Sequence, residues 1–297
     1  MLETPYFTLV IPTYNRAQFI TDTVKSVIAQ TDQDFEIVVV DDGSTDNTEE
    51  VVQKIDDSRL TFYRKENRER AAARNYGAAR ARGQYINFLD SDDVLYSNHL
   101  SAARRLIEKF QHPEIFHLGF EMRDGSGNLL DRIDSFTGEL NEKLLSGNRL
   151  SCNGVFLRRD VALQFRFNED RRLSASEDWE LWLRLAARFP IHYSNEVTSV
   201  IVNHETRSVL QSQEQALRDR MELTLKYLSE DKEFISKYGS RRHLIESEFL
   251  SYIALHLALA GEGKRARGYL KESVLKRPGS IFQRRFLAVV KHIIRNS

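Results

Sequence analysis

Four short apolar segments alternate with three helical patterns over the first ninety residues, and this alternation constrains the fold more than any other feature of the chain. The strand-like segments cover residues 7–11, 35–40, 60–64 and 85–89, and we expect Pro12 to end the first of them. The segment 35–40 is continuously apolar, which is typical of a strand covered on both faces. A repeated strand–helix–strand order predicts an α/β protein with a doubly wound, mostly parallel sheet flanked by helices.

Polar clusters follow three of these strands directly, at 12–15 (PTYN), 41–44 (DDGS) and 90–93 (DSDD). Ligands of doubly wound sheets bind beyond the carboxyl ends of the strands, so we expect the three loops to meet at one crevice. Asp90 and Asp92, with Ser91 between them, can present oxygens to one hard cation such as Mg²⁺ or Mn²⁺. An acidic turn is a solvated cap roughly ten times more often than it is a metal site. A metal site is favoured here only because the other two polar loops are expected at the same crevice.

Two further groups fit a nucleotide. Asp42 could accept a hydrogen bond from a nucleobase, and Tyr14 could stack on the base. Arg70 and Arg74 fall beside the start of the next helix, where guanidinium groups and free N–H donors favour phosphate. The simpler interpretations are a helix cap near Asp46 and a solvated helix face.

The alternation loosens after residue 93. Strand patterns recur at 114–122, 153–157 and 197–202, and an amphipathic helix is predicted for 177–189. From about residue 206 the chain has only helical patterns, including a tetratricopeptide-like hairpin over 251–278. We therefore predict an α/β domain over 1–205 and an all-α region over 206–297.

Charge and cysteine content exclude several classes of protein. The 43 Lys and Arg residues balance 43 Asp and Glu residues, so no overall charge indicates a nucleic-acid partner. The single cysteine, Cys152, forms no intramolecular disulfide and no Cys/His zinc motif is present; we interpret it as a packing residue. The sequence contains no apolar run of about 20 residues and no signal-peptide pattern at its start, so we expect a cytoplasmic protein.

The end of the chain is basic. Residues 264–297 contain ten Lys and Arg residues and one acid, Glu272. Within 281–297, apolar and basic residues alternate at helical spacing. This pattern has two readings of similar weight: peripheral contact with anionic lipid at the inner face of the membrane, or a helix packed on the protein with solvated cations.

Four ordered motifs carry a family resemblance: VIPTYNR from residue 10, VVVDDGSTD from 38, ARNYGAARARGQYINFLDSDD from 73 and SEDWELWLRLA from 176. In this order they resemble the large inverting glycosyltransferase family (family 2 type) that has the GT-A fold and uses nucleotide-sugar donors. The resemblance covers residues 6–205, about two thirds of the chain.

The resemblance implies a role for each matching residue. It places Pro12, Thr13, Tyr14 and Asp42 around the nucleoside, with Asp42 at the base. Asp90, Ser91 and Asp92 would lie at the ribose and diphosphate, with Asp92 as a metal ligand, and Arg70 or Arg74 would face the phosphates. His204 occupies the place of a histidine that binds the metal or the diphosphate. Asp178 matches the catalytic base, and Glu177 and Trp179 would face the acceptor.

The chemistry agrees with these implied roles. A single inverting displacement needs one carboxylate to deprotonate the acceptor opposite the leaving group. A cofactor Mn²⁺ or Mg²⁺ would stabilise the charge on the departing diphosphate.

The segment NRER at 67–70 departs from the glycines common in relatives, and no QxxRW-like segment of processive synthases occurs. We therefore expect transfer of one sugar, most simply from a UDP-sugar, to a saccharide or lipid-linked saccharide. The rival interpretation is a catalytically silent module that binds nucleotide-sugars or acts as a scaffold in a membrane-associated polysaccharide assembly.

Overall fold

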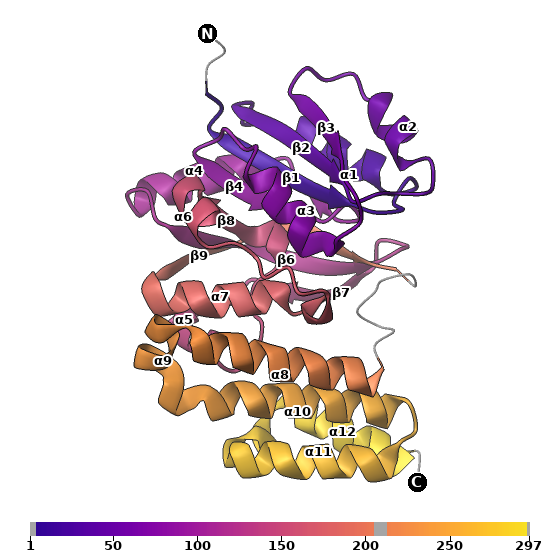
Figure 1. Ribbon diagram of the computed structural model, residues 1–297, viewed down its shortest axis with the longest axis vertical. Helices are drawn as coiled ribbons and strands as arrows, with labels where there is room; N and C mark the ends of the chain where they lie inside the picture. Colours follow the sequence, from indigo (N-terminus) through magenta and orange to yellow (C-terminus); the bar gives the residue numbers. More distant parts are fainter. Residues whose placement is uncertain (1–3, 205–212, 296–297) are drawn as a thin grey trace. The chain divides into compact units, whose positions relative to one another are not determined.

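A computed structural model of the chain describes residues 4–204 and 213–295. Nine strands of these residues form one sheet in the order β3-β2-β1-β4-β8-β6-β9-β5, with β7 paired to β6 (Figure 1). The strands are β1 (Phe7–Thr13), β2 (Phe35–Asp41), β3 (Leu60–Arg64), β4 (Tyr85–Phe88), β5 (Val94–Leu95), β6 (Ile115–Asp124), β7 (Leu129–Ile133), β8 (Val155–Arg158) and β9 (Ile191–Asn203).

The α-helices lie between and after the strands. They are α1 (Ile20–Ile28), α2 (Thr48–Gln53), α3 (Glu69–Ala78), α4 (His99–Lys109), α5 (Leu140–Leu144), α6 (Arg159–Gln164), α7 (Glu177–Arg188), α8 (Glu214–Glu230), α9 (Lys232–Tyr238), α10 (Arg242–Leu259), α11 (Gly263–Lys276) and α12 (Arg284–Arg295). The α/β order predicted for the first ninety residues is confirmed, and so is the helical region that follows the sheet.

The first four strands are parallel, as expected, but the sheet is mixed beyond β4. Strand β8 runs antiparallel to both β4 and β6, whereas β6 and β9 are parallel. The polar turn at 124–128 joins β6 to β7 as an antiparallel hairpin. Such a short connection can join only antiparallel neighbours, because a parallel pair needs a long crossover.

Pro12 does not end β1, which corrects the expectation from the sequence. The strand continues to Thr13, and Pro12 is in register with Val40 of β2. The carbonyl of Thr13 accepts from the N–H of Asp42 on the β2 side, so Pro12 faces the β4 side. Strand β4 pairs with β1 only as far as Val10, so Pro12, which has no N–H, lies just past the end of that pairing.

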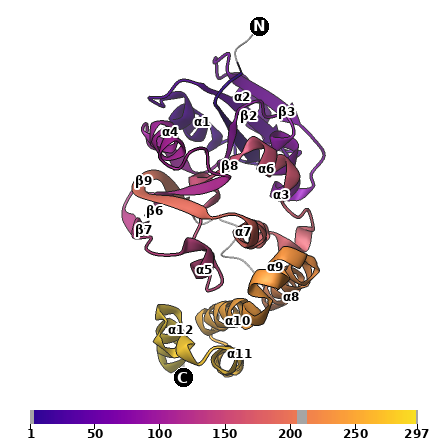
Figure 2. The ribbon, with the colours of Figure 1, turned by 90° about the vertical axis from the view of Figure 1, so that its left-hand side faces the viewer.

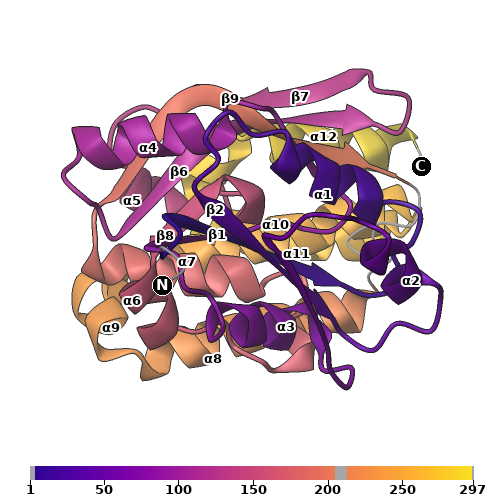
Figure 3. The same cartoon turned by 90° about the horizontal axis from the view of Figure 1, so that it is seen from above.

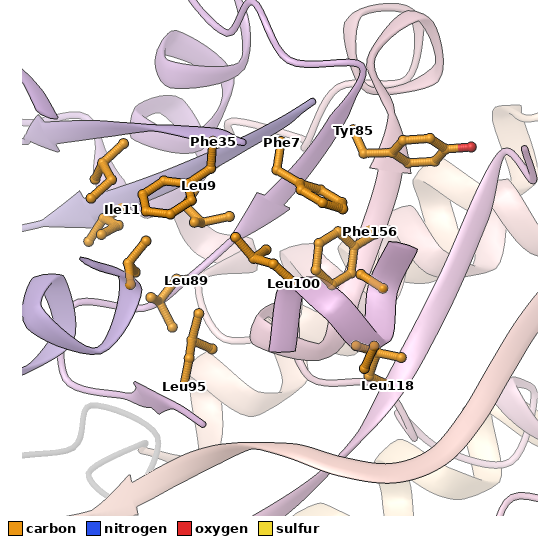
Figure 4. Packing of buried hydrophobic residues seen from close by; sticks show 14 of the residues in the cluster. Phe7, Leu9, Ile11, Phe35, Tyr85, Leu89, Leu95, Leu100, Leu118 and Phe156 are labelled. Atoms are coloured by element: carbon orange, nitrogen blue, oxygen red, sulfur yellow. The ribbon is translucent and has the colours of Figure 1, made fainter. Parts of the chain in front are cut away.

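Both faces of β1 are buried by helices (Figure 3). Phe7, Leu9 and Ile11 pack into a core with apolar residues of α1 and α4 on one face (Figure 4). On the other face α3 approaches so closely that a Cβ at Gly77 would lie 2.4 Å from Val10 Cγ1. This double cover holds the carboxyl ends of the strands rigidly, and the candidate site is built there.

The described chain forms two compact units. The first contains the sheet, its covering helices and the start of α7; the second contains α8 to α12 together with 141–149 and 182–188. In the second unit, α10 packs against α8, α11 and α12 (Figure 2). The helical hairpin expected over 251–278 is α10 and α11, which turn at Gly261 with a φ of 82°.

Among the described residues, none of the helices has the length and apolar character required to cross a membrane.

Candidate active site

A buried arginine joins the loop after β4 to the start of α7. Arg74 is 1% exposed; its Nη2 donates to Asp90 Oδ1 at 2.6 Å and its Nη1 to Glu177 Oε1 at 2.8 Å. Arg70, one helical turn earlier on α3, places its Nε 3.9 Å from the same Glu177 oxygen. Buried charges persist when they are paired, so this bridge holds two loops together that are 87 residues apart in sequence, from Asp90 to Glu177.

The electrostatics of this cluster include Cys152 and Asp178. Burial works to lower the pKa of Arg74, but its interactions with Cys152, Asp90 and Glu177 outweigh burial and raise that pKa well above its usual value. Burial raises the pKa of the Cys152 thiol; Arg74 opposes this rise, and Asp178, Asp90 and Glu177 add to it. Cys152 therefore stays a buried thiol, as the sequence suggested. Asp178 belongs to the same electrostatic neighbourhood as Asp90.

One carboxylate oxygen of Asp92, Oδ2, contacts both His204 and Arg16. His204 Nε2 lies 3.0 Å from Asp92 Oδ2, and Arg16 Nε donates to that oxygen at 3.3 Å. Asp93 positions this group, since its Oδ1 accepts from the N–H of Val202 near the end of β9 at 3.0 Å. The ring of His204 also stacks on Phe19, with centroids 4.6 Å apart.

Asp92 and His204 place a carboxylate oxygen and an imidazole nitrogen 3.0 Å apart. The part of the chain that the structure describes contains no group of three or more His, Cys, Asp and Glu side chains suited to an ion. Mg²⁺ and Mn²⁺ are commonly held by one or two protein ligands together with substrate phosphates, and imidazole is an acceptable donor to Mn²⁺. The pair therefore fits a cation that shares its coordination sphere with a diphosphate.

The nucleoside side of the predicted site lies at the ends of β1 and β2. Thr13 is buried, and within the described residues its Oγ1 has no hydrogen-bond partner. Tyr14 beside it is 45% exposed, so its ring is accessible to a base. Asp42 is buried, pairs with Lys65 Nζ and accepts from the N–H of Arg68 at 3.1 Å. A carboxylate has about four acceptor positions, so Asp42 retains capacity for a base N–H.

Several predicted site residues are less accessible than the sequence suggested. Glu177 and Trp179, expected to face the acceptor, are 2% and 6% exposed, and Glu177 instead pairs with Arg74. Arg74 has both terminal nitrogens on carboxylates, so it positions Asp90 rather than offering an open phosphate contact. Pro12 and Ser91 are buried. We assign none of these side chains an acceptor or phosphate contact.

Asp178 lies in the first turn of α7 and is partly exposed, unlike its neighbours. Its Oδ1 accepts from the N–H of Trp179 at 2.7 Å. Carboxylates are stabilised at helix N-termini, so Asp178 also has a structural role at the start of α7. The Glu177 bridge fixes this turn beside the loop that carries Asp90 and Asp92.

Sequence reasoning missed Arg16 and Lys65 as members of the site. Arg16 lies within the VIPTYNR motif, and Lys65 directly follows β3. Its position one residue past a parallel strand was a usable signal for Lys65, because the carboxyl ends of these strands share one edge.

The fold and this arrangement together define a class of protein: a GT-A-type transferase, with acidic residues gathered at the carboxyl ends of a mixed sheet. The chain belongs to glycosyl transferase family 2, whose sequence profile matches residues 8–162.

Curated relatives support this assignment. An uncharacterized glycosyltransferase of Rickettsia bellii is 32% identical over 184 residues, 61% of this chain and 26% of that protein. The putative teichuronic acid biosynthesis glycosyltransferase TuaG of Bacillus subtilis is 30% identical over 197 residues, 65% of this chain and 77% of TuaG. The chain spans between 26% and 33% of the length of three of the Rickettsia relatives it matches.

Solved structures share the fold. S. aureus TarS 1-349 in complex with UDP-GlcNAc aligns with a TM-score of 0.64 and 18% identity, over 94% of this chain and 93% of that one. The mannosyltransferase PcManGT from Pyrobaculum calidifontis, in complex with GDP-Man and Mn²⁺, aligns with a TM-score of 0.61 and 17% identity, over 99% and 86%. At this level of identity the likeness establishes the GT-A fold.

Proposed function

We propose that this glycosyltransferase moves a single sugar, with inversion, from a UDP-sugar to a saccharide or lipid-linked saccharide acceptor. One observation carries the proposal: the Asp90–Arg74–Glu177 bridge brings the loop of Asp92 and the helix turn of Asp178 to one site. A diphosphate-side carboxylate and a second, partly exposed carboxylate are the two groups that an inverting transfer requires.

Asp178 is the general base in this proposal. It accepts the proton of the acceptor hydroxyl as the oxygen attacks the anomeric carbon, and the bond to the diphosphate breaks on the opposite face of the sugar. Asp178 is suited to this role because it is partly exposed while Glu177 and Trp179 beside it are buried. The adjacent ion pair holds the helix turn in place, so little reorganisation is needed during the reaction.

Asp92 and His204 would hold a Mn²⁺ or Mg²⁺ ion in this proposal. The ion would supply positive charge to the departing diphosphate. Arg70, half-buried at the start of α3, lies next to the same cluster and is the cation we assign to the phosphates. Tyr14 would stack on the base, with Thr13 Oγ1 and Asp42 as its polar contacts. The relatives solved with UDP-GlcNAc and with GDP-Man and Mn²⁺ support a nucleotide-sugar donor and a divalent ion.

A screen of nucleotide sugars by thermal shift, with and without Mn²⁺ or Mg²⁺, tests the donor and the metal together. Ligand binding raises the apparent melting temperature by mass action, and a donor at about 100 times its Kd adds about 2.7 kcal/mol. We expect the largest shift with a UDP-sugar plus metal, and release of UDP once an acceptor is supplied. Stabilisation by GDP-sugars alone would refute the UDP assignment, and binding without release of nucleoside diphosphate with any acceptor would favour the silent module.

Asp92→Ala provides the variant for that screen. We expect the metal-dependent part of the donor shift to disappear, because one of two protein ligands is lost, while any metal-independent shift remains. Asp131→Ala, an exposed acid on β7, is the matched control and should behave as the parent protein. Metal-dependent stabilisation that persists in Asp92→Ala would remove Asp92 from the metal site.

Arg16→Gln should increase the affinity for Mn²⁺ in the absence of nucleotide. Arg16 Nε donates to the Asp92 oxygen that also faces His204, so its charge competes with a cation for that oxygen. A charge-assisted hydrogen bond contributes about 1.5–3 kcal/mol at most, and a partly exposed one less, so we expect a gain of about three- to tenfold. Titration with Mn²⁺ followed by electron paramagnetic resonance measures the affinity directly.

Arg105→Gln serves as the control for this titration, since Arg105 pairs with Glu196 on an exposed surface away from Asp92. An unchanged or weaker Mn²⁺ affinity in Arg16→Gln would contradict a competing role for Arg16.

A further inference from the structure

Large apolar side chains are exposed together near the end of the second unit. They lie at the end of α11, in the 3₁₀ turn Pro278–Phe282 and on α12. We call this surface the C-terminal apolar face; its members are Leu275, Ile281, Phe282, Leu287 and Ile294, exposed by 39–85%. Exposed apolar residues are ordinary when they are scattered, but these five fall within residues 275–294, and such a concentration favours an interaction surface.

The orientation of α12 is fixed by its opposite side. Val289 and Ile293 are buried in a core with residues of α10 and α11, and Phe286 and Val290 pack against that core. Leu287 and Ile294 are seven positions apart, two turns of helix, so they lie on one side of α12. They therefore point away from the core, as their exposures of 61% and 70% show.

The segment that carries the C-terminal apolar face is basic. Residues 273–297 contain six Lys and Arg residues and no Asp or Glu. Arg285 and Lys276 pair with Glu248 and Glu246 of α10. Arg284, Lys291 and Arg295 are exposed on α12, and their spacing places them on the same side as Leu287.

We propose that the C-terminal apolar face docks on an anionic lipid bilayer, with Phe282, Leu287 and Ile294 entering the headgroup boundary and Arg284, Lys291 and Arg295 binding lipid phosphates. This combination of apolar side chains and lysine or arginine along one helix is typical of interfacial membrane helices. A protein interface fits less well, because the segment 273–297 carries charge of one sign only, which matches a uniformly anionic surface. The docking goes beyond the transfer reaction and requires none of its residues. It would concentrate the enzyme where a lipid-linked acceptor resides.

Sedimentation with vesicles tests the docking on the full chain. Vesicles of phosphatidylcholine with roughly 30 mol% phosphatidylglycerol, which have a negative surface potential, are compared with pure phosphatidylcholine. We expect the protein to pellet with the anionic vesicles, less so at high salt, and to stay in the supernatant with the neutral ones. Failure to pellet with anionic vesicles, or equal pelleting with both kinds, overturns the proposal.

Two double variants separate the contribution of the apolar side chains to vesicle binding from that of the cations. Phe282→Ser with Leu287→Ser removes apolar side chains, and Arg284→Glu with Lys291→Glu reverses charge. Each should lower the partition coefficient by about tenfold or more, since both apolar burial and cations contribute to interfacial binding. Leu130→Ser, which changes an exposed leucine on β7, should bind as the parent does.

Thermal unfolding checks that the variants fold. We expect melting temperatures close to that of the parent protein, because every substituted side chain is exposed. Deletion of 281–297 is unsuitable, since it would remove Val289 and Ile293 from the core. Unchanged pelleting of both double variants overturns the proposal. So does a dimer, seen by light scattering, that disappears in the same variants, since a second copy would then be the occupant. Vesicle binding is measured without donor, so it can fail or succeed independently of the proposed transfer.

Discussion

Asp178→Asn should abolish sugar transfer and leave donor binding intact. Proton transfer by a positioned side chain contributes about 10²–10⁴-fold to rate, so we expect the turnover number to fall by about that factor. The replacement is nearly isosteric, and the amide oxygen of asparagine can still accept the Trp179 N–H that Asp178 Oδ1 accepts at 2.7 Å. The helix turn should therefore be preserved, so the loss would report on the carboxylate as a base.

The measurement is release of nucleoside diphosphate under saturating donor and acceptor, together with the thermal shift caused by the donor alone. Asp131→Asn, on the exposed strand β7, controls for the removal of one negative charge. Full turnover in Asp178→Asn would exclude this residue as the base, and loss of the donor shift would place it in the donor pocket instead.

Arg74→Met should destabilise the first unit by about 3–5 kcal/mol, the usual cost of removing one partner from a buried ion pair. Methionine has a similar length but leaves Glu177, 2% exposed, without its 2.8 Å partner and frees Asp90 from its 2.6 Å contact. Because the same contacts hold the loop of Asp92 beside Asp178, the variant should also lose transfer activity. Unfolding in urea, followed by the fluorescence of the two tryptophans, Trp179 and Trp182, measures the change.

A second substitution makes this prediction testable even if Arg74→Met does not fold. In Arg74→Met with Glu177→Gln the uncompensated charge is removed, so part of the stability should return while activity stays low. Arg80→Met, an exposed arginine just past α3 that stacks on Tyr76, should cost less than about 1 kcal/mol. Equal losses of unfolding free energy in Arg74→Met and Arg80→Met would show that the Asp90–Arg74–Glu177 bridge does not stabilise the first unit.

Much of the sheet was predictable because its signals are local. The runs at 35–40 and 60–64 correspond to β2 and β3 within one residue, and the periodicity through Ile20 and Val27 corresponds to α1. Beyond residue 93 the strands depend on distant partners: β9 extends from Ile191 to Asn203, far beyond the expected 197–202. Its first residues alternate poorly in hydrophobicity, and it is their pairing with β6 that makes them a strand.

The candidate site was predictable in its location and only partly in its members. Loops that follow parallel strands must share an edge, so Thr13, Asp42 and Asp92 could be grouped from sequence. The partners of Asp92 and Glu177 could not be deduced, because Arg16 and Arg74 reach them across 76 and 103 positions of sequence. A pattern along the chain does not show which carboxylate pairs with the guanidinium group of a long, flexible arginine side chain.

The sequence by itself determined the α/β alternation, the family motifs and the residue types available for metal, phosphate and base, because periodicity and turn chemistry act over a few neighbouring residues. Only the tertiary structure decided that Glu177 is a buried partner of Arg74 while Asp178 stays accessible, and that Leu287 faces outward while Val289 faces the core. Adjacent residues of one helix point in different directions, and which direction is buried depends on what packs against the helix.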